Sequence, residues 1–140
     1  MTDKRRMILI VDDEPDITTV LKITLEDNGF QVDSFNDPIL ALENFRKRFY
    51  SLLILDIHMP DMNGFELYTK IKKIDDKSKV CFLTASEMYY KELRKDKYES
   101  LDKELFLLKP IAPNDLIKQI KKILCLISIM TLTAVTDLTV

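Results

Sequence analysis

Charged and polar side chains follow short apolar runs at four separate points of the sequence. Asp12 and Asp13 come directly after MILIV, Asp56 ends LLILD, Thr84 lies near the end of KVCFLTAS, and Lys109 ends ELFLLK. Three carboxylates that lie close together cannot all stay ionised without a cation. A small hard divalent ion with oxygen ligands is the natural neutraliser, and Mg²⁺ is the abundant candidate. Because Mg²⁺ also binds phosphate oxygens, the pattern predicts a site for phosphoryl chemistry.

Each of these side chains has a chemical task in such a site. The carboxylate of Asp56 can attack phosphorus in line and form an acyl phosphate. Lys109 can supply a point charge for one phosphoryl oxygen, and the hydroxyl of Thr84 can donate a hydrogen bond to another. Catalysis would then consist mostly of positioning and of charge neutralisation.

The spacing of apolar residues indicates which elements position these groups. Continuous or alternating apolar runs predict strands, and apolar residues at helical spacing predict the helices between them. This alternation predicts an open, doubly wound α/β domain with a parallel sheet. The expected strands are 7–11, 30–35, 52–56, 79–86 and 104–109. The expected helices run from Pro15 to Asn28, from Pro38 onward, from Phe65 to Ile74, from Glu87 to about Lys103, and from Asn114 onward. The helix that begins at Pro38 is expected to carry Ile39, Leu42, Phe45 and Phe49 on one face.

Each candidate residue also has a purely structural interpretation. Asp12 and Asp13 could favour a helix N-terminus through the helix dipole, and Asp56 and Thr84 could act as caps. Lys109 could be an ordinary surface lysine. The joint site is favoured because ligands of doubly wound sheets bind outside the carboxyl ends of the strands, where all five side chains are expected.

Four motifs then carry a resemblance that covers roughly residues 6–125. ILIVDDEP, LLILDIHMPDMNGFEL, CFLTAS and FLLKP stand in the order and at the strand ends typical of one family. The chain resembles the receiver domain of two-component response regulators, and in particular the chemotaxis-regulator type. The resemblance implies a flavodoxin-like (βα)₅ fold whose five-stranded parallel sheet has the order 2-1-3-4-5.

The resemblance also implies a role for each matching residue. The implied phosphoacceptor is Asp56, the implied Mg²⁺ ligands are Asp12, Asp13, Asp56 and the backbone carbonyl of His58, and the implied phosphoryl-binding and switch residues are Thr84, Lys109 and Phe106. Phosphorylation would pull Thr84 toward the new oxygens, and Phe106 would rotate into the space behind it. Phe106 can equally be a simple core residue, and the side chain of His58 is more often a neighbour of such a site than a ligand.

Members of this family take the phosphoryl group from a histidine kinase or a phosphotransfer protein and lose it by hydrolysis. We therefore expect a phosphoacceptor regulator rather than an enzyme, with an unidentified downstream protein as its second partner. A homodimer through the fourth helix, fifth strand and fifth helix, or through the C-terminal tail, is a further expectation. Two alternatives stay open: a phosphohydrolase of the haloacid dehalogenase type, and a degenerate receiver that acts as an interaction scaffold.

Composition limits the other classes of function. With 140 residues and a net charge of −2, the chain fits one domain without a strong field for nucleic acid or an anionic membrane. Cys81 and Cys125 have no metal-ligand or CxxC spacing, which is typical of reduced thiols in the cytoplasm. We expect a receiver domain over 1–125 and an apolar tail over 126–140 that extends the last helix, forms an interface or is disordered.

Two regions depart from the pattern of the family. The stretch between Thr84 and Lys109 is longer than expected and lacks the usual glycine–alanine turn, so the chain departs from the family at the output face. The segment 123–136 carries no charge. As a helix it would be about 21 Å long, short of the roughly 30 Å that a membrane core requires, so a membrane anchor is not favoured.

Overall fold

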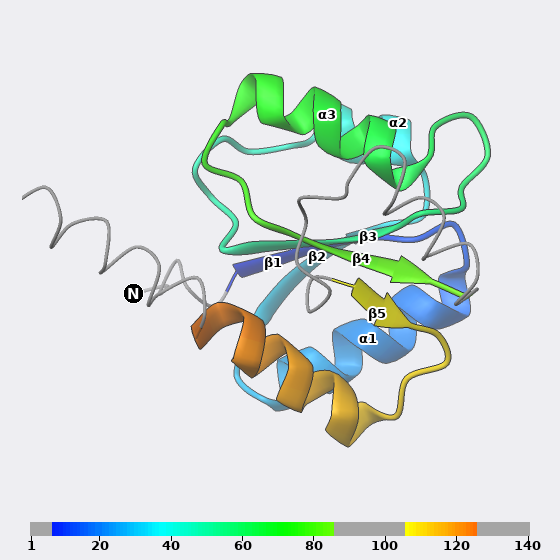
Figure 1. Ribbon diagram of the computed structural model, residues 1–140, viewed down its shortest axis with the longest axis vertical. Helices are drawn as coiled ribbons and strands as arrows, with labels where there is room; N and C mark the ends of the chain where they lie inside the picture. Colours follow the sequence, from blue (N-terminus) through cyan, green and yellow to red (C-terminus); the bar gives the residue numbers. More distant parts are fainter. Residues whose placement is uncertain (1–6, 86–105, 126–140) are drawn as a thin grey trace, which may run out of the picture.

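A parallel five-stranded sheet forms the centre of the protein, as the computed structural model of residues 7–85 and 106–125 shows (Figure 1). The strand order is β2-β1-β3-β4-β5, and every pairing is parallel. The strands are β1 (Met7–Val11), β2 (Gln31–Phe35), β3 (Leu52–Asp56), β4 (Val80–Thr84) and β5 (Phe106–Leu108). The helices are α1 (Pro15–Asp27), α2 (Pro38–Glu43) and α3 (Gly64–Ile74), and residues 113–125 are also helical. The predicted fold class and strand order are confirmed.

Helices cover both faces of this sheet, and each face has its own apolar core. Figure 1 shows α2 and α3 on one face and α1 with the helix 113–125 on the other. Alternate residues of a strand point to opposite faces, so Ile8 and Ile10 join the core under α1, whereas Leu9 and Val11 join the core under α3. All residues of β1, β3 and β4 are buried, which explains why these strands are continuous apolar runs.

The ends of α1 and α3 follow local signals in the sequence. Pro15 occupies the start of α1, and the chain leaves the helix at Asn28, followed by Gly29 at a φ of 90°. At the start of α3, Asn63 accepts a hydrogen bond from the backbone N–H of Glu66, whose side chain accepts one from the backbone of Asn63. These two helices therefore begin where the sequence predicts.

The predicted extent of α2 is wrong. We expected a helix from Pro38 that includes Phe45 and Phe49, but it ends at Glu43. One local and one tertiary contact explain the early end. The side-chain amide of Asn44 donates to the Leu40 carbonyl four residues earlier, and Arg48 adopts a φ of 60° while its backbone N–H donates to Asp75. Ile39, expected on the packed face of the helix, is largely exposed.

The start of α3 lies directly against the end of β3. A Cβ atom at Gly64 would collide with the carbonyl oxygen of Asp56, and the N–H of Gly64 donates to the carbonyl of Ile57 at 3.1 Å. Only glycine fits this close approach of two backbones. The loop from His58 to Asn63 is thereby folded back over the carboxyl end of β3.

Several expectations fall outside the part of the chain that the structure describes. The helix expected from Glu87 to about Lys103 and the apolar tail 126–140 lie there, and so does Ser86 at the end of the expected fourth strand. Across residues 7–85 and 106–125, no helix is long and apolar enough to span a bilayer.

Candidate functional site

The carboxyl ends of β1, β3 and β5 bring the predicted acidic residues and the predicted lysine together. Ligand oxygens of Asp12, Asp13 and Asp56 all lie within 4.8 Å of one another. Asp12 and Asp56 are almost fully buried, and Asp13 is partly exposed. This juxtaposition is what the doubly wound topology predicts for residues that follow neighbouring parallel strands.

The ammonium group of Lys109 lies among three carboxylates. Its Nζ atom is 2.7 Å from Oδ2 of Asp12, 3.2 Å from Oδ1 of Asp56 and 3.3 Å from Oε1 of Glu14. The side chain of Lys109 is only 9% exposed, whereas that of Glu14 is 61% exposed. Lys109 is therefore no ordinary surface lysine, because it is the cation that faces both buried carboxylates in this pocket.

Burial raises the pKa of both carboxyl groups, and the cation compensates only in part. Burial and the nearby charge of Asp12 raise the pKa of Asp56 to about 7, despite the opposing effect of Lys109. Burial likewise raises the pKa of Asp12, against the hydrogen bonding and charge of Lys109. Burial alone would lower the pKa of Lys109, but its hydrogen bonds and charge pairing with Asp12 and Asp56 together raise it. The pocket therefore has more negative charge than one ammonium group neutralises.

One buried oxygen of the pocket is suited to a metal ion. Oδ1 of Asp12 accepts a hydrogen bond from the backbone N–H of Glu14 at 3.0 Å. Oδ2 of Asp12 is fully buried, and among the described residues its partner is the Lys109 ammonium, 2.7 Å away. Buried oxygens are normally satisfied. An oxygen-only donor set of three carboxylates with one ammonium group beside it, and so with a deficit of positive charge, fits Mg²⁺.

Side chains that the sequence did not single out fix the backbone beneath Asp12. The amide of Asn36 donates to the carbonyl of Asp12 at 2.8 Å and to the hydroxyl of Thr18 at 2.9 Å. The N–H of Asp12 donates to the carbonyl of Phe35 at 3.1 Å. These bonds tie the loop after β1 to the end of β2. No spacing in the sequence indicates these hydrogen bonds, because Asn36 lies 24 residues from Asp12.

The remaining predicted residues take different places. Thr84 ends β4 and is buried, and its carbonyl accepts the backbone N–H of Lys109 at 2.8 Å. Phe106 is 8% exposed and packs on Phe82 with ring centroids 5.6 Å apart. The residue His58 is exposed in the loop after β3. The structure thus brings Thr84 to the strand end next to Lys109 and leaves Phe106 in the core of the α3 face.

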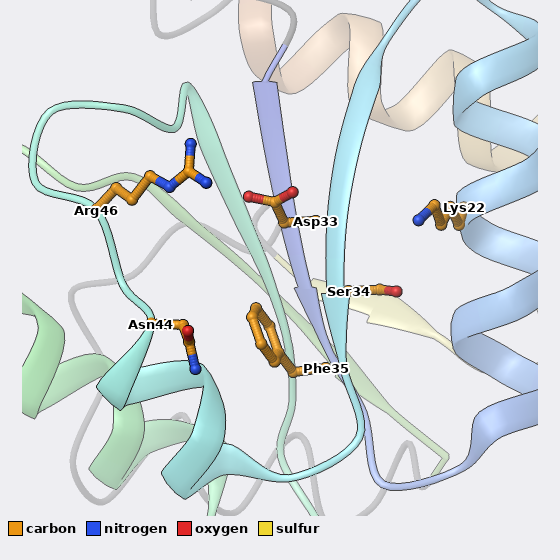
Figure 2. A pocket seen from close by; sticks show the side chains of 6 residues that line it. All are labelled: Lys22, Asp33, Ser34, Phe35, Asn44 and Arg46. Atoms are coloured by element: carbon orange, nitrogen blue, oxygen red, sulfur yellow. The ribbon is translucent and has the colours of Figure 1, made fainter.

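A hollow lies at the outer edge of β2. It has a volume of about 260 Å³ and is lined by Lys22, Asp33, Ser34, Phe35, Asn44 and Arg46 (Figure 2). Asp33 accepts a hydrogen bond from the hydroxyl of Tyr50 at 2.6 Å. None of the residues that line this hollow belongs to the predicted site.

Comparison with known proteins agrees with the geometry. The family described as the response regulator receiver domain matches residues 8–121. The response regulator receiver protein CpdR of Brucella abortus is 33% identical over 119 residues, which cover 85% of this chain and 97% of CpdR. Other relatives are much longer: the match to the transcriptional regulatory protein TrcR of Mycobacterium tuberculosis covers only 31% of TrcR.

Solved structures show the same likeness. A CheY-like receiver domain protein from Methanospirillum hungatei has a TM-score of 0.71 at 29% identity, covering 88% of this chain and 96% of that one. The response regulator TrrA of Thermotoga maritima, solved with Mg²⁺ and a beryllium fluoride, has a TM-score of 0.68 at 32% identity. The match covers 84% of this chain and 97% of TrrA. TrrA has also been solved in complex with the histidine kinase ThkA. The strand order, the acidic pocket and these matches agree that the chain belongs to the response regulator receiver domain family.

Proposed function

We propose that Asp56 is the phosphoacceptor of this receiver domain and that it takes its phosphoryl group from a phosphohistidine in a Mg²⁺-dependent reaction. The observation that carries the proposal is the placement of the Asp56 carboxylate 3.2 Å from the Lys109 ammonium and within metal-binding distance of Asp12 and Asp13. As the bond from an Asp56 oxygen to phosphorus forms, the bond from phosphorus to the imidazole nitrogen breaks. The imidazole leaves and takes up a proton.

Asp12, Asp13, Asp56 and the backbone carbonyl of His58 are the residues that would hold Mg²⁺. The bound ion would supply positive charge to the phosphoryl oxygens and orient them. Asp56 must be ionised to attack, and burial with the charge of Asp12 raises its pKa to about 7. Added positive charge in the pocket favours the ionised carboxylate, so binding of the ion and reactivity of Asp56 are coupled.

Lys109 and Thr84 would receive the transferred group. The ammonium already lies beside Asp56, so it can pair with a phosphoryl oxygen after little movement. Thr84 ends the neighbouring strand β4, and its hydroxyl would donate to another phosphoryl oxygen. Phe106 is already buried against Phe82, so phosphorylation would hold this ring in place rather than drive it inward. The inward rotation of Phe106 on phosphorylation stays a prediction.

The partner that donates the phosphoryl group would be a histidine kinase or a phosphotransfer protein. The complex of the similar regulator TrrA with the kinase ThkA supports this class of partner. A downstream protein, or a second copy of this chain, would contact the face that includes β5 and the helix 113–125. The buried thiol of Cys81 is compatible with a cytoplasmic protein.

Mass spectrometry after incubation with Mg²⁺ and acetyl phosphate tests the proposal. We expect an adduct of about 80 Da, the mass of one phosphoryl group, in the wild type and none in Asp56→Asn. Asp61→Asn is the matched control, because Asp61 lies in the loop after β3 with a φ of 70°, which asparagine tolerates well. An adduct that persists in Asp56→Asn would contradict the assignment of the phosphoacceptor. A wild type that never reacts would favour the interaction scaffold instead.

A further inference from the structure

Lys109 interacts differently with its three carboxylate neighbours. Its ammonium donates a hydrogen bond to Oε1 of Glu14 at 3.3 Å. Its contacts with the two buried carboxylates are ion pairs, 2.7 Å to Oδ2 of Asp12 and 3.2 Å to Oδ1 of Asp56. The cation is thus shared between two buried carboxylates and one exposed carboxylate.

The side chain of Glu14 has no other task at its position. Glu14 is the residue that precedes α1, yet its side chain makes no capping hydrogen bond to that helix. Its backbone is held firmly, since the N–H of Glu14 donates to Oδ1 of Asp12 and Pro15 starts the helix. The carboxylate, 61% exposed, therefore stands on a fixed backbone at the mouth of the pocket, within reach of Lys109.

A divalent ion at the acidic cluster and the ammonium group would compete for the same carboxylates. An ion bound by Asp12, Asp13 and Asp56 would share Asp12 and Asp56 with Lys109, whose Nζ atom is now 2.7 Å from the first and 3.2 Å from the second. Two cations at that distance repel each other, so the ammonium must withdraw as the ion enters. Glu14 offers the position to which it can withdraw without leaving Asp56.

We propose that Glu14 is a positioning residue for Lys109: its carboxylate retains the ammonium at the mouth of the pocket while Mg²⁺ displaces it from Asp12. The inference rests on the proposed function, because it assumes that Mg²⁺ binds at the acidic cluster. It adds a role for Glu14, which contacts neither the ion nor the phosphoryl group in this scheme. Loss of the Glu14 carboxylate makes the withdrawal of Lys109 less favourable and so weakens Mg²⁺ binding.

The test is a titration with MgCl₂ followed by amide NMR shifts, because the chain has no tryptophan to report binding by fluorescence. Glu14→Gln should raise the Mg²⁺ dissociation constant roughly two- to fivefold, the range for an exposed ion pair. Asp16→Asn is the matched control. It removes the same charge from the first turn of α1, and the constant should change by less than about 1.5-fold.

A double-mutant cycle with Lys109→Gln separates positioning from a general loss of negative charge. In the Lys109→Gln background, Glu14→Gln should change the dissociation constant no more than Asp16→Asn does. The inference is overturned if Glu14→Gln and Asp16→Asn have equal effects with Lys109 present, or if the effect of Glu14→Gln persists without the lysine. Should Lys109→Gln not fold, Lys109→Met takes its place in the cycle. A wild type that binds no Mg²⁺ would overturn the proposed function itself.

Discussion

Asp56 and Asp75 are both almost fully buried, yet they lie at opposite ends of the parallel strands and their pKa values move in opposite directions. Asp56 is 2% exposed at the carboxyl end of β3, and burial raises its pKa to about 7. Asp75 is 4% exposed and follows α3, on the side where the strands begin. Burial would raise the pKa of Asp75 too, but hydrogen bonds from the backbone N–H groups of Arg48 and Lys77 lower it below its ordinary value.

The number of donors explains the difference between the two carboxylates. Oδ2 of Asp75 accepts the N–H of Arg48 at 2.8 Å, Oδ1 accepts the N–H of Lys77 at 3.1 Å, and the Arg48 guanidinium lies 3.3 Å from Oδ1. Asp56 faces one ammonium group, and that group is shared with Asp12. A buried carboxylate with a full set of donors stabilises the fold, whereas one that lacks donors is available to bind an ion or to react.

The largest effect on stability is expected from Lys109→Gln without divalent ions. The substitution leaves Asp12 and Asp56 buried without a cation, so the free energy of unfolding should fall by about 3 kcal/mol, near the lower end for breaking a buried pair, because the carboxylates can take up a proton. Urea denaturation in EDTA measures it. Adding MgCl₂ should restore part of the loss. Equal free energies of unfolding for wild type and variant in EDTA would mean that Lys109 does not stabilise the buried carboxylates of Asp12 and Asp56.

The pH dependence of stability should differ between wild type and Asp56→Asn in EDTA. The pKa of Asp56 is about 7 when folded against an ordinary value of 3.8, so the folded state binds more protons than the unfolded state between these values. The contribution of Asp56 to the free energy of unfolding therefore falls as the pH rises through this window. Between about pH 5 and about pH 8, the variant should gain about 2 kcal/mol relative to wild type. A constant difference in urea titrations at several pH values would contradict the raised pKa.

Asp75→Asn should destabilise the protein by about 1–2 kcal/mol. Both oxygens of Asp75 accept backbone hydrogen bonds, and an amide can accept on only one side. Because folding lowers the pKa of Asp75, its carboxylate stabilises the folded state fully when the pH is above the ordinary pKa of an aspartate. This stabilisation is lost as the pH falls through the lowered pKa of the folded state. Denaturation at neutral and at acidic pH measures this. The phosphoryl adduct should still form in this variant, which separates the structural carboxylate from the reactive one.

The smallest effect is expected from Asp76→Asn. Asp76 also pairs with Arg48, but the contact is 3.5 Å long and the Asp76 side chain is 78% exposed. Exposed pairs contribute little, so the free energy of unfolding should change by less than about 0.5 kcal/mol. A change as large as that of Asp75→Asn in parallel urea titrations would show that Arg48, rather than the backbone donors, anchors this end of the sheet.

The sequence predicted the end of the sheet that holds the acidic cluster better than the opposite end. The strand ends at Asp56 and just before Lys109 could be predicted because continuous apolar runs stop abruptly at these charges. The early end of α2 and the donors of Asp75 were not visible, because they depend on a turn at Arg48 that contacts a residue 27 positions away. The same holds for the contact between Glu14 and Lys109, separated by 95 residues. Local patterns fix strands and helix ends, but which side chain meets which partner is decided only by packing.

The contact of Gly64 with the Asp56 carbonyl has a consequence for how this domain tolerates change. Any side chain at position 64 pushes against the backbone that carries the phosphoacceptor proposed above. In a library of all single substitutions selected for folded protein, this position should be nearly as restricted as the core of the sheet, although it begins a surface helix. The range of residues tolerated at position 64 is set by the short distance between the backbones of Gly64 and Asp56, and not by the chemistry of the side chain.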